Sequence, residues 1–255
     1  MKKLGMRSTL VFIFSIFLCF SLFAQKSKGK QKASNSEYQG EMQDGKKHGY
    51  GKLVFDDGGM YEGQWKEDKR HGGGIYYFPN KDRYEGAFED NMMHGIGTYY
   101  YADGKRYFGY IQYGSITGQG TCYYTNGDVY DGLWVNSQRE GHGKYTYSNG
   151  NVYEGNWEND EKNGEGVYLY ANGNKYTGQF LSGNKTGYGI FEWSDGERYE
   201  GQFLEGKMNG KGIYYFRNGD IYEGRWLNNE LHGKGVLKKV DGTIIPKNYN
   251  MGREE

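Results

Sequence analysis

The residues best suited to chemistry in this chain are five histidines, four of which follow a fixed spacing. His48, His71 and His94 lie 23 residues apart, His232 keeps the same period, and His142 is displaced from it by two positions. Imidazole groups in register would suit metal binding or acid–base catalysis. One metal ion holds its ligands at about 2 Å, whereas equivalent residues of successive hairpins would lie about 9–10 Å apart. We therefore predict that these histidines form hydrogen bonds rather than a metal or catalytic site.

No other reactive group completes a catalytic arrangement. Cys122 is the single cysteine after residue 25, so an internal disulfide is not expected there. Gly-x-Gly pairs such as Gly72/Gly74 precede no helical pattern and are not expected to bind phosphate. We interpret the acids that recur once per period as a solvated face: Glu62, Glu85, Asp131, Glu154, Glu200 and Glu223. The sequence predicts no enzyme, no cofactor and no metal.

The histidines belong to a strict 23-residue repeat. Tyr-x-Gly occurs nine times at this interval, from Tyr38/Gly40 to Tyr222/Gly224, without an insertion or deletion. A spacing kept so strictly indicates that each unit meets the next in the same geometry, which is typical of a repeat array rather than a globular enzyme. The nine units cover residues 38–244, and we expect no separate catalytic domain beside them.

The positions within one unit, counted from its tyrosine, predict two antiparallel strands. Large residues at 1, 5 and 16 alternate with glycines at 3, 12 and 14, as expected for strands. Asn or Asp at 20 and Gly at 21 fit a three-residue hairpin loop with a left-handed glycine. A four-residue loop at 7–10 would join the strands at 1–6 and 11–18. Both loops then pair 1 with 16, 3 with 14 and 5 with 12.

The predicted fold is all-β: an elongated, twisted, single-layer antiparallel sheet of nine 23-residue β-hairpin repeats, with eighteen strands. Rings at 1, 5 and 16 would lie over the glycines and shield the backbone, so that one layer can bury apolar surface. Open sheets of this length twist or curl, and we expect a curved trough.

The unit Tyr61-Glu-Gly-Gln-Trp65, followed by His71-Gly-Gly-Gly-Ile-Tyr76, resembles the MORN (membrane occupation and recognition nexus) repeat. The resemblance spans all nine units, and the fourth departs most, with Ile111 in place of Trp. It implies an extended antiparallel sheet of hairpins. It also implies a role as an interaction scaffold, which in some members is associated with lipid or appended to an enzyme.

The N-terminal sequence predicts export. A basic start and the apolar stretch Leu10–Phe23 indicate a signal peptide over residues 1–24, with an uncleaved anchor as the alternative. Residues 25–37 read as a flexible basic linker, residues 38–244 as the repeats, and residues 245–255 as a C-terminal tail in which Pro246 would blunt the sheet edge. We expect a periplasmic, cell-surface or secreted bacterial protein.

The net charge of the chain limits the classes of partner that it can bind. Seven of the 32 basic residues precede Glu37, so the rest of the chain carries 25 basic against 32 acidic residues, a net charge of −7. Nucleic-acid binding needs a basic face, and we exclude it.

One unit breaks the pattern on the face opposite the aromatic rows. Positions 2 and 4 are usually polar, but the fourth unit has Phe108 and Tyr110 there. Drift of a repetitive sequence is the favoured explanation, and the alternative is a contact site, which an exposed aromatic patch can mark. The candidate partner-binding residues are Ile96, Tyr100, Phe108, Tyr110 and Tyr123.

These observations support three hypotheses. The first is an exported, non-enzymatic scaffold that binds a protein or peptide along its curved sheet. The alternative is an envelope-attachment module that binds membrane lipid or cell-wall glycan. The third, a hydrolase that works from the loops, has no residue set to support it.

Overall fold

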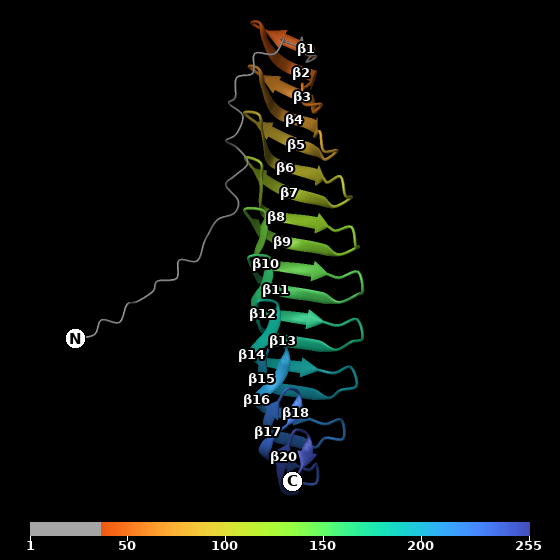
Figure 1. Cartoon of the computed structure of the whole chain (residues 1–255), viewed down its shortest axis with the longest axis vertical. Coiled ribbons are helices and arrows are strands. Elements are labelled where there is room, and N and C mark those ends of the chain that lie inside the picture. Colours follow the sequence, from red (N-terminus) through yellow and green to blue (C-terminus); the bar gives the residue numbers. More distant parts are fainter. Residues whose placement is uncertain (1–36) are drawn as a thin grey trace, which may run out of the picture. The chain divides into compact units, whose positions relative to one another are not determined.

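The computed structural model describes residues 37–255, so the predicted signal peptide and nearly all of the predicted linker lie outside the described residues. Within this part of the chain there is no helix, and 21 strands form one open antiparallel sheet (Figure 1). The predicted all-β repeat fold is therefore confirmed.

Each strand pairs with the next one along the chain, except that β17 pairs with both β18 and β19. The strands are β1 (Tyr38–Gln43), β2 (Lys46–Val54), β3 (Met60–Lys66), β4 (Lys69–Tyr77), β5 (Arg83–Glu89), β6 (Met92–Tyr100), β7 (Arg106–Gln112), β8 (Ser115–Tyr123), β9 (Val129–Val135), β10 (Gln138–Thr146), β11 (Val152–Glu158), β12 (Glu161–Leu169), β13 (Lys175–Leu181), β14 (Asn184–Glu192), β15 (Arg198–Leu204), β16 (Lys207–Tyr215), β17 (Ile221–Leu227), β18 (Glu230–Leu231), β19 (Gly233–Lys238), β20 (Ile244–Asn250) and β21 (Arg253–Glu254).

The turn between repeats has the predicted form. In the first repeat, Phe55 N donates to Gly59 O at 2.8 Å and Gly58 N donates to Phe55 O at 3.0 Å, which closes a three-residue loop. Gly58 takes the left-handed conformation with φ of 89°. Lys81 occupies the same position with φ of 74°, so this turn forms even where glycine is absent. These turns place position 18 of a repeat opposite position 22 and give the predicted pairing between repeats.

The turn inside each repeat differs from the prediction. Lys66 pairs directly with Lys69, and the two residues between them both have positive φ, as in a two-residue type I′ turn. The register then shifts between Gly63 and Trp65, so that Trp65 pairs with Arg70 rather than with Gly72. The predicted four-residue loop, and the pairing of 5 with 12 inside a repeat, are therefore wrong.

The shift has a physical reason in the glycine at position 12. Between the pairs Gly63–Gly74 and Trp65–Arg70, β3 has one residue and β4 has three, so the bulge adds two residues to β4. A bulge often needs a left-handed backbone, which glycine adopts without strain. Gly72 has φ of 64°. Between repeats the predicted pairing is correct, because Gly72 pairs with Phe88 of the next repeat.

The rings cover one face of the sheet as predicted, and hydrogen bonds explain their identity. Tyr61 is fully buried over Gly63 and Gly74. Its hydroxyl donates to Gln64 O at 2.9 Å, and Gln64 lies in the register shift, where it has no partner in β4. Trp65 Nε1 donates to a glycine carbonyl of the preceding repeat at 3.0 Å. Tyrosine at position 1 thus satisfies a backbone group that phenylalanine could not.

Side chains at position 22 connect successive repeats at the three-residue turns. Asp128 accepts hydrogen bonds from Tyr145 Oη at 2.7 Å and from Ser148 N at 2.8 Å, both in the next repeat. Burial alone would raise the pKa of Asp128, but the hydrogen bonds outweigh it and lower this pKa below its usual value. Asn151 has the same role one repeat later, where it accepts from Ala171 N at 2.9 Å.

The last eleven residues, assigned to a tail from the sequence, continue the sheet as β20 and β21. They account for two of the three strands beyond the expected eighteen, and the interruption between β18 and β19 accounts for the third. Ile245 and Tyr249 keep the apolar positions 1 and 5 of a tenth, incomplete unit, and Tyr249 packs against Tyr222 at 5.8 Å between ring centroids. Pro246 lies within β20, opposite Val236.

Candidate functional site

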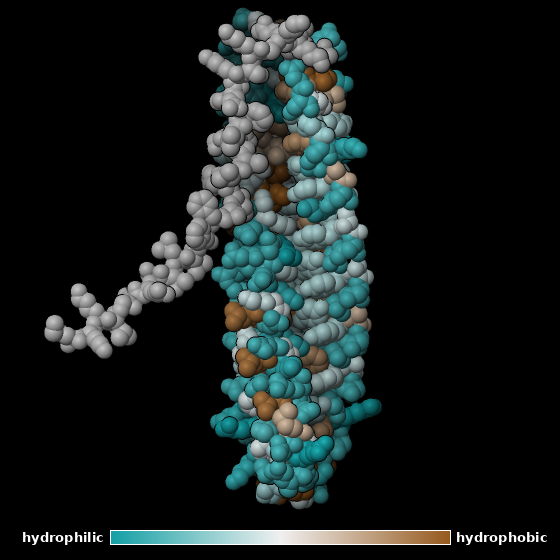
Figure 2. Space-filling view, in the orientation of Figure 1, coloured by the Kyte–Doolittle hydropathy of each residue, from teal (hydrophilic) through white to brown (hydrophobic). Residues whose placement is uncertain are grey.

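The two faces of the sheet differ in what they leave available to a partner. The ring face carries positions 1, 3, 5, 14, 16 and 18, and its side chains at positions 1 and 5 are buried from β3 to β17. The open face carries positions 2, 4, 6, 13, 15 and 17, where Ile96 is 57% and Phe108 is 52% exposed. Exposed hydrophobic residues are scattered among mostly hydrophilic ones on the surface drawn in Figure 2.

Lysine and arginine side chains lie over the rings of the ring face. Position 10 places Arg70 with its Cζ 4.7 Å from the ring centroid of Tyr76. Lys162 Nζ lies 5.1 Å from the centroid of Tyr168, and burial lowers the pKa of Lys162. Cation–π contacts of this kind hold the charge over the rings. This row was not predicted from the sequence, although Lys or Arg at position 10 in five of the nine repeats is its signal. With it in place, the ring face is largely filled by the chain's own side chains.

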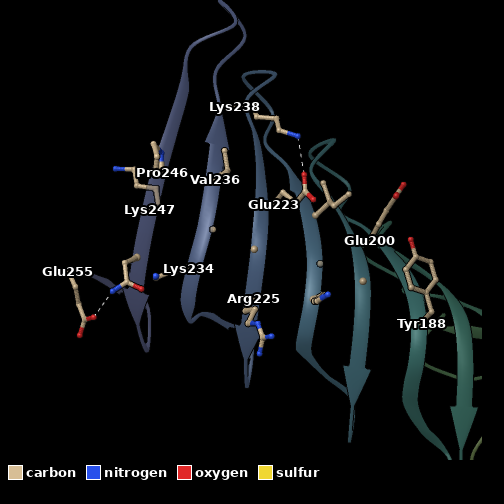
Figure 3. Close-up of a pocket in the computed structure, with 17 residues that line it drawn as sticks. Tyr188, Glu200, Glu223, Arg225, Lys234, Val236, Lys238, Pro246, Lys247 and Glu255 are labelled. Carbon is tan, nitrogen blue, oxygen red and sulfur yellow. Dashed lines mark hydrogen bonds and ion pairs between the residues drawn. The ribbon is translucent and has the colours of Figure 1, made fainter.

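A groove of about 1150 Å³ lies on the open face at the C-terminal end (Figure 3). We call it the C-terminal groove. Its floor is glycine backbone, contributed by positions 3 and 14 of the last two repeats: Gly201, Gly212, Gly224 and Gly235. A side chain at these positions would point to the ring face, where a Cβ would meet the rings of Tyr199 and Tyr222, so these residues present only main chain to the groove.

The two walls of the C-terminal groove have different chemistry. One wall carries positions 2 and 15, namely Glu200, Ile213, Glu223 and Val236. The other carries positions 4 and 13, including Lys211, Arg225 and Lys234. Figure 3 shows Arg225 and Lys234 at one end of neighbouring strands and Val236, Pro246 and Glu223 further along them.

The charges on the two walls are not paired across the floor. Glu223 accepts from Lys238 Nζ at 3.0 Å, and Glu200 forms an ion pair with Arg198. Within residues 37–255, Lys211, Arg225 and Lys234 form no ion pair at all. These cations were not predicted as site residues from the sequence, although they stand at positions 13 and 4 in consecutive strands.

The structure places the predicted contact residues together on the open face. We call Ile96, Tyr100, Phe108, Tyr110 and Tyr123 the central patch. Ile96 pairs with Tyr110, and Phe108 lies between Thr98 and Thr121, as the register predicted.

Arginine side chains cover part of the central patch. The guanidinium of Arg83 lies 4.1 Å from the ring centroid of Tyr100, and that of Arg106 lies 4.3 Å from that of Tyr123. Ile96 and Phe108 remain more than half exposed. They are the apolar centre of the patch, and the two tyrosines border it.

His94 and Cys122 show how the reactive residues are placed in residues 37–255. His94 Nε2 lies 3.5 Å from both Glu89 Oε2 and Tyr110 Oη. Cys122 is only 3% exposed, and burial raises the pKa of its thiol, so it is poorly reactive. No cluster of three or more His, Cys, Asp or Glu in this range is placed to hold a metal. Nor does the same range contain a helix long and apolar enough to cross a membrane.

Comparison with known families agrees with this geometry. The family model described as MORN repeat matches nine consecutive segments, 38–60, 61–83, 84–106, 107–129, 130–152, 153–175, 176–198, 199–221 and 222–244. The chain belongs to the MORN repeat family. These boundaries coincide with the 23-residue units counted from tyrosine. Among curated proteins, none matches the chain significantly.

Two of the solved structures similar to this MORN protein are of one domain, alone and in a complex. The TCP10 domain of Danio rerio CPAP has 12% identity and a TM-score of 0.44, covering 84% of this chain and 95% of that one. The same domain in complex with a peptide of Danio rerio STIL has 14% identity and a TM-score of 0.47, covering 84% of this chain and 100% of that one. Such low values carry no inference about the function of the MORN array.

Proposed function

We propose that this chain is an exported, non-enzymatic scaffold that binds a protein or peptide along the open face of its MORN array. The observation that carries the proposal is the contrast between the faces. Rings and cations fill the ring face, whereas the open face has exposed side chains and a groove floored by glycine backbone. A surface of varied side chains on a rigid repeat array suits recognition of an extended partner.

The central patch supplies the anchor in this proposal. Binding energy at protein interfaces concentrates in a few large side chains near the centre of the contact. Ile96 and Phe108 are exposed, lie on adjacent strands and are flanked by tyrosines that combine apolar and polar surface. Phe108 lies in the fourth of the nine repeats, with three repeats before it and five after it, so a partner segment can extend from the patch in both directions.

Export forms part of the proposal and rests on the N-terminal sequence alone. The basic start and apolar stretch are typical of a signal peptide. Expression of the full chain with a C-terminal tag, followed by cell fractionation and N-terminal sequencing, tests it. A cytoplasmic product that retains its N-terminus would refute export.

The binding proposal is tested by affinity capture from the native cell envelope with Phe108→Ala and with Leu204→Ala as the matched control. Leu204 is similarly exposed, at 54%, and lies on the open face outside the central patch. We expect a discrete protein that binds Phe108→Ala at least fivefold more weakly, as for an interface anchor, and binds the control as well as the original chain.

Equal capture by both variants would show that the central patch is not part of the binding site. Sedimentation with lipid vesicles or with purified cell walls addresses the alternative partners. If the protein sediments with either of them and captures no protein, the scaffold proposal is wrong and the envelope-attachment alternative is correct.

A further inference from the structure

We infer that the C-terminal groove binds an extended peptide segment in which acidic and aliphatic residues alternate. The acidic side chains would meet Lys211, Arg225 and Lys234, and the aliphatic ones would lie against Ile213 and Val236. This inference deepens the proposed function and rests on it, since it names the chemistry of one part of the partner.

The cationic wall is the first argument. Lys211 and Arg225 are direct cross-strand partners in β16 and β17, and Lys234 follows in β19. Like charges placed opposite each other on a sheet destabilise it. The three have no ion pair within residues 37–255, although this part of the chain has a net charge of −7. An anionic ligand would relieve this repulsion.

The opposite wall is the second argument. Ile213 and Val236 border the same glycine floor at position 15 of successive repeats. They pair with Glu223 and with Pro246 respectively, so this wall presents aliphatic side chains beside the acids Glu200 and Glu223. An occupant therefore meets positive charge on one side, and aliphatic side chains interspersed with carboxylates on the other.

The spacing of the wall residues fits an extended chain. Successive side chains of an extended peptide point to opposite sides, and alternate ones lie about 6.8 Å apart. Three neighbouring strands span about 10 Å. Two carboxylates at positions i and i+2 of a peptide that runs across the strands can therefore both reach the cationic wall, while the residue between them faces Ile213 or Val236.

The acids of the groove favour a peptide over other polyanions. Glu200 and Glu223 stand on the aliphatic wall and would face a bilayer headgroup or a nucleic-acid backbone that covered the whole groove. An alternating peptide places its own carboxylates only on the cationic side, away from Glu200 and Glu223. Glu255, which accepts from Asn248 opposite Lys234, is the acid of the groove lining on that side. Charge complementarity therefore selects a narrow, one-sided acidic ligand.

The test uses the purified protein and a fluorescein-labelled Glu-Val-Glu-Val-Glu-Val peptide in a fluorescence anisotropy titration at low salt. The comparison peptides are Glu-Glu-Glu-Val-Val-Val, which has the same composition in blocks, and Lys-Val-Lys-Val-Lys-Val. We expect the alternating acidic peptide to bind more tightly than the block peptide, the lysine peptide not to bind, and the affinity to fall as salt screens the charges.

Single variants locate the site. Lys211→Gln, Arg225→Gln and Lys234→Gln should each weaken binding about two- to fivefold, as expected for exposed ion pairs. Arg217→Gln is the matched control, because this exposed arginine lies in a turn outside the groove and its loss changes the net charge equally. The triple variant should remain folded in circular dichroism, since it loses repulsion between like charges.

Several outcomes would overturn the inference: equal binding by the control and the groove variants, equal binding of the two acidic peptides, or anionic vesicles that bind with the same sensitivity to the three variants. The scaffold proposal is judged separately by protein capture through the central patch. If capture depends on Phe108 while the groove variants change no peptide binding, the inference fails and the scaffold proposal stands.

Discussion

Two adjacent glycines of β4 should respond to alanine in opposite directions. A Cβ at Gly74 would lie 2.6 Å from Tyr61 Cε2, whereas a Cβ at Gly73, on the open face, would have no atom within 4 Å. Carbon atoms pack at about 3.5–4.0 Å, so in Gly74→Ala the Tyr61 ring would have to move by about 1 Å. The ring cannot move freely, because it is fully buried, with Phe88 at 4.9 Å between centroids.

The magnitude follows from these contacts. Overpacking costs about 1–3 kcal/mol, and displacement of the Tyr61 hydroxyl from Gln64 O costs about 1 kcal/mol more. Replacing glycine by alanine in a strand recovers roughly 0.5–1 kcal/mol. Gly74→Ala should therefore lower the free energy of unfolding by about 1–3 kcal/mol, and Gly73→Ala should raise it by about 0.5–1 kcal/mol.

Thermal unfolding followed by far-ultraviolet circular dichroism measures both effects, at about 2–4 °C of Tm per kcal/mol for a chain of this size. Hydrogen exchange of β3 and β4 should accompany it, because a repeat array can open locally. Shifts of the same sign in the two variants would refute the assignment of the two faces at these positions.

Further predictions follow from the same contacts. Tyr153→Phe leaves Asn156 O without the hydroxyl that now donates at 2.8 Å, and should lower the free energy of unfolding by about 1–3 kcal/mol in urea titration. Asp128→Ala should lower it similarly, whereas Asp128→Asn should have a smaller effect because Asn151 fills the equivalent position; comparison of the two by urea titration would decide. The pKa values of Asp82 and Asp128 are lowered in the folded state. Their contribution to the free energy of unfolding should therefore be fully present above about pH 5 and be lost as the pH drops below their ordinary value of 3.8. A flat Tm from pH 5 to pH 2 would contradict this. Deleting one whole 23-residue repeat should leave a shorter folded array, and deleting eleven residues should disrupt it, as judged by circular dichroism.

Local patterns were enough to predict much of the fold. Alternation of large residues with glycine assigned side chains to faces, and the Asn/Asp-Gly turn fixed the register between repeats. The pairing of Ile96 with Tyr110 followed from that register and proved correct, so the central patch was assembled without coordinates. These features depend only on neighbouring repeats, and a strict period repeats the same local solution nine times.

The type I′ turn was missed although part of its signal is local. Asp44-Gly45 is a favoured pair for such a turn, but Glu67-Asp68 in the next repeat is not. In the bulged strand pair, Trp65 and Tyr61 satisfy backbone carbonyls through bonds of 3.0 and 2.9 Å, and Gly72 takes a left-handed backbone among the three residues of β4 that face one residue of β3. Those gains exist only once two strands and their rings have packed.

The sequence by itself determined the period, the strands, the two faces and the register between repeats, because each depends on residues close along the chain or one repeat away. The tertiary structure decided which face stays open, where the C-terminal groove lies and that Lys211, Arg225 and Lys234 line one wall of it. It also decided that residues 245–255 continue the sheet. These features arise from bulges, ring packing and the position of the last strand together, and no single repeat contains that information.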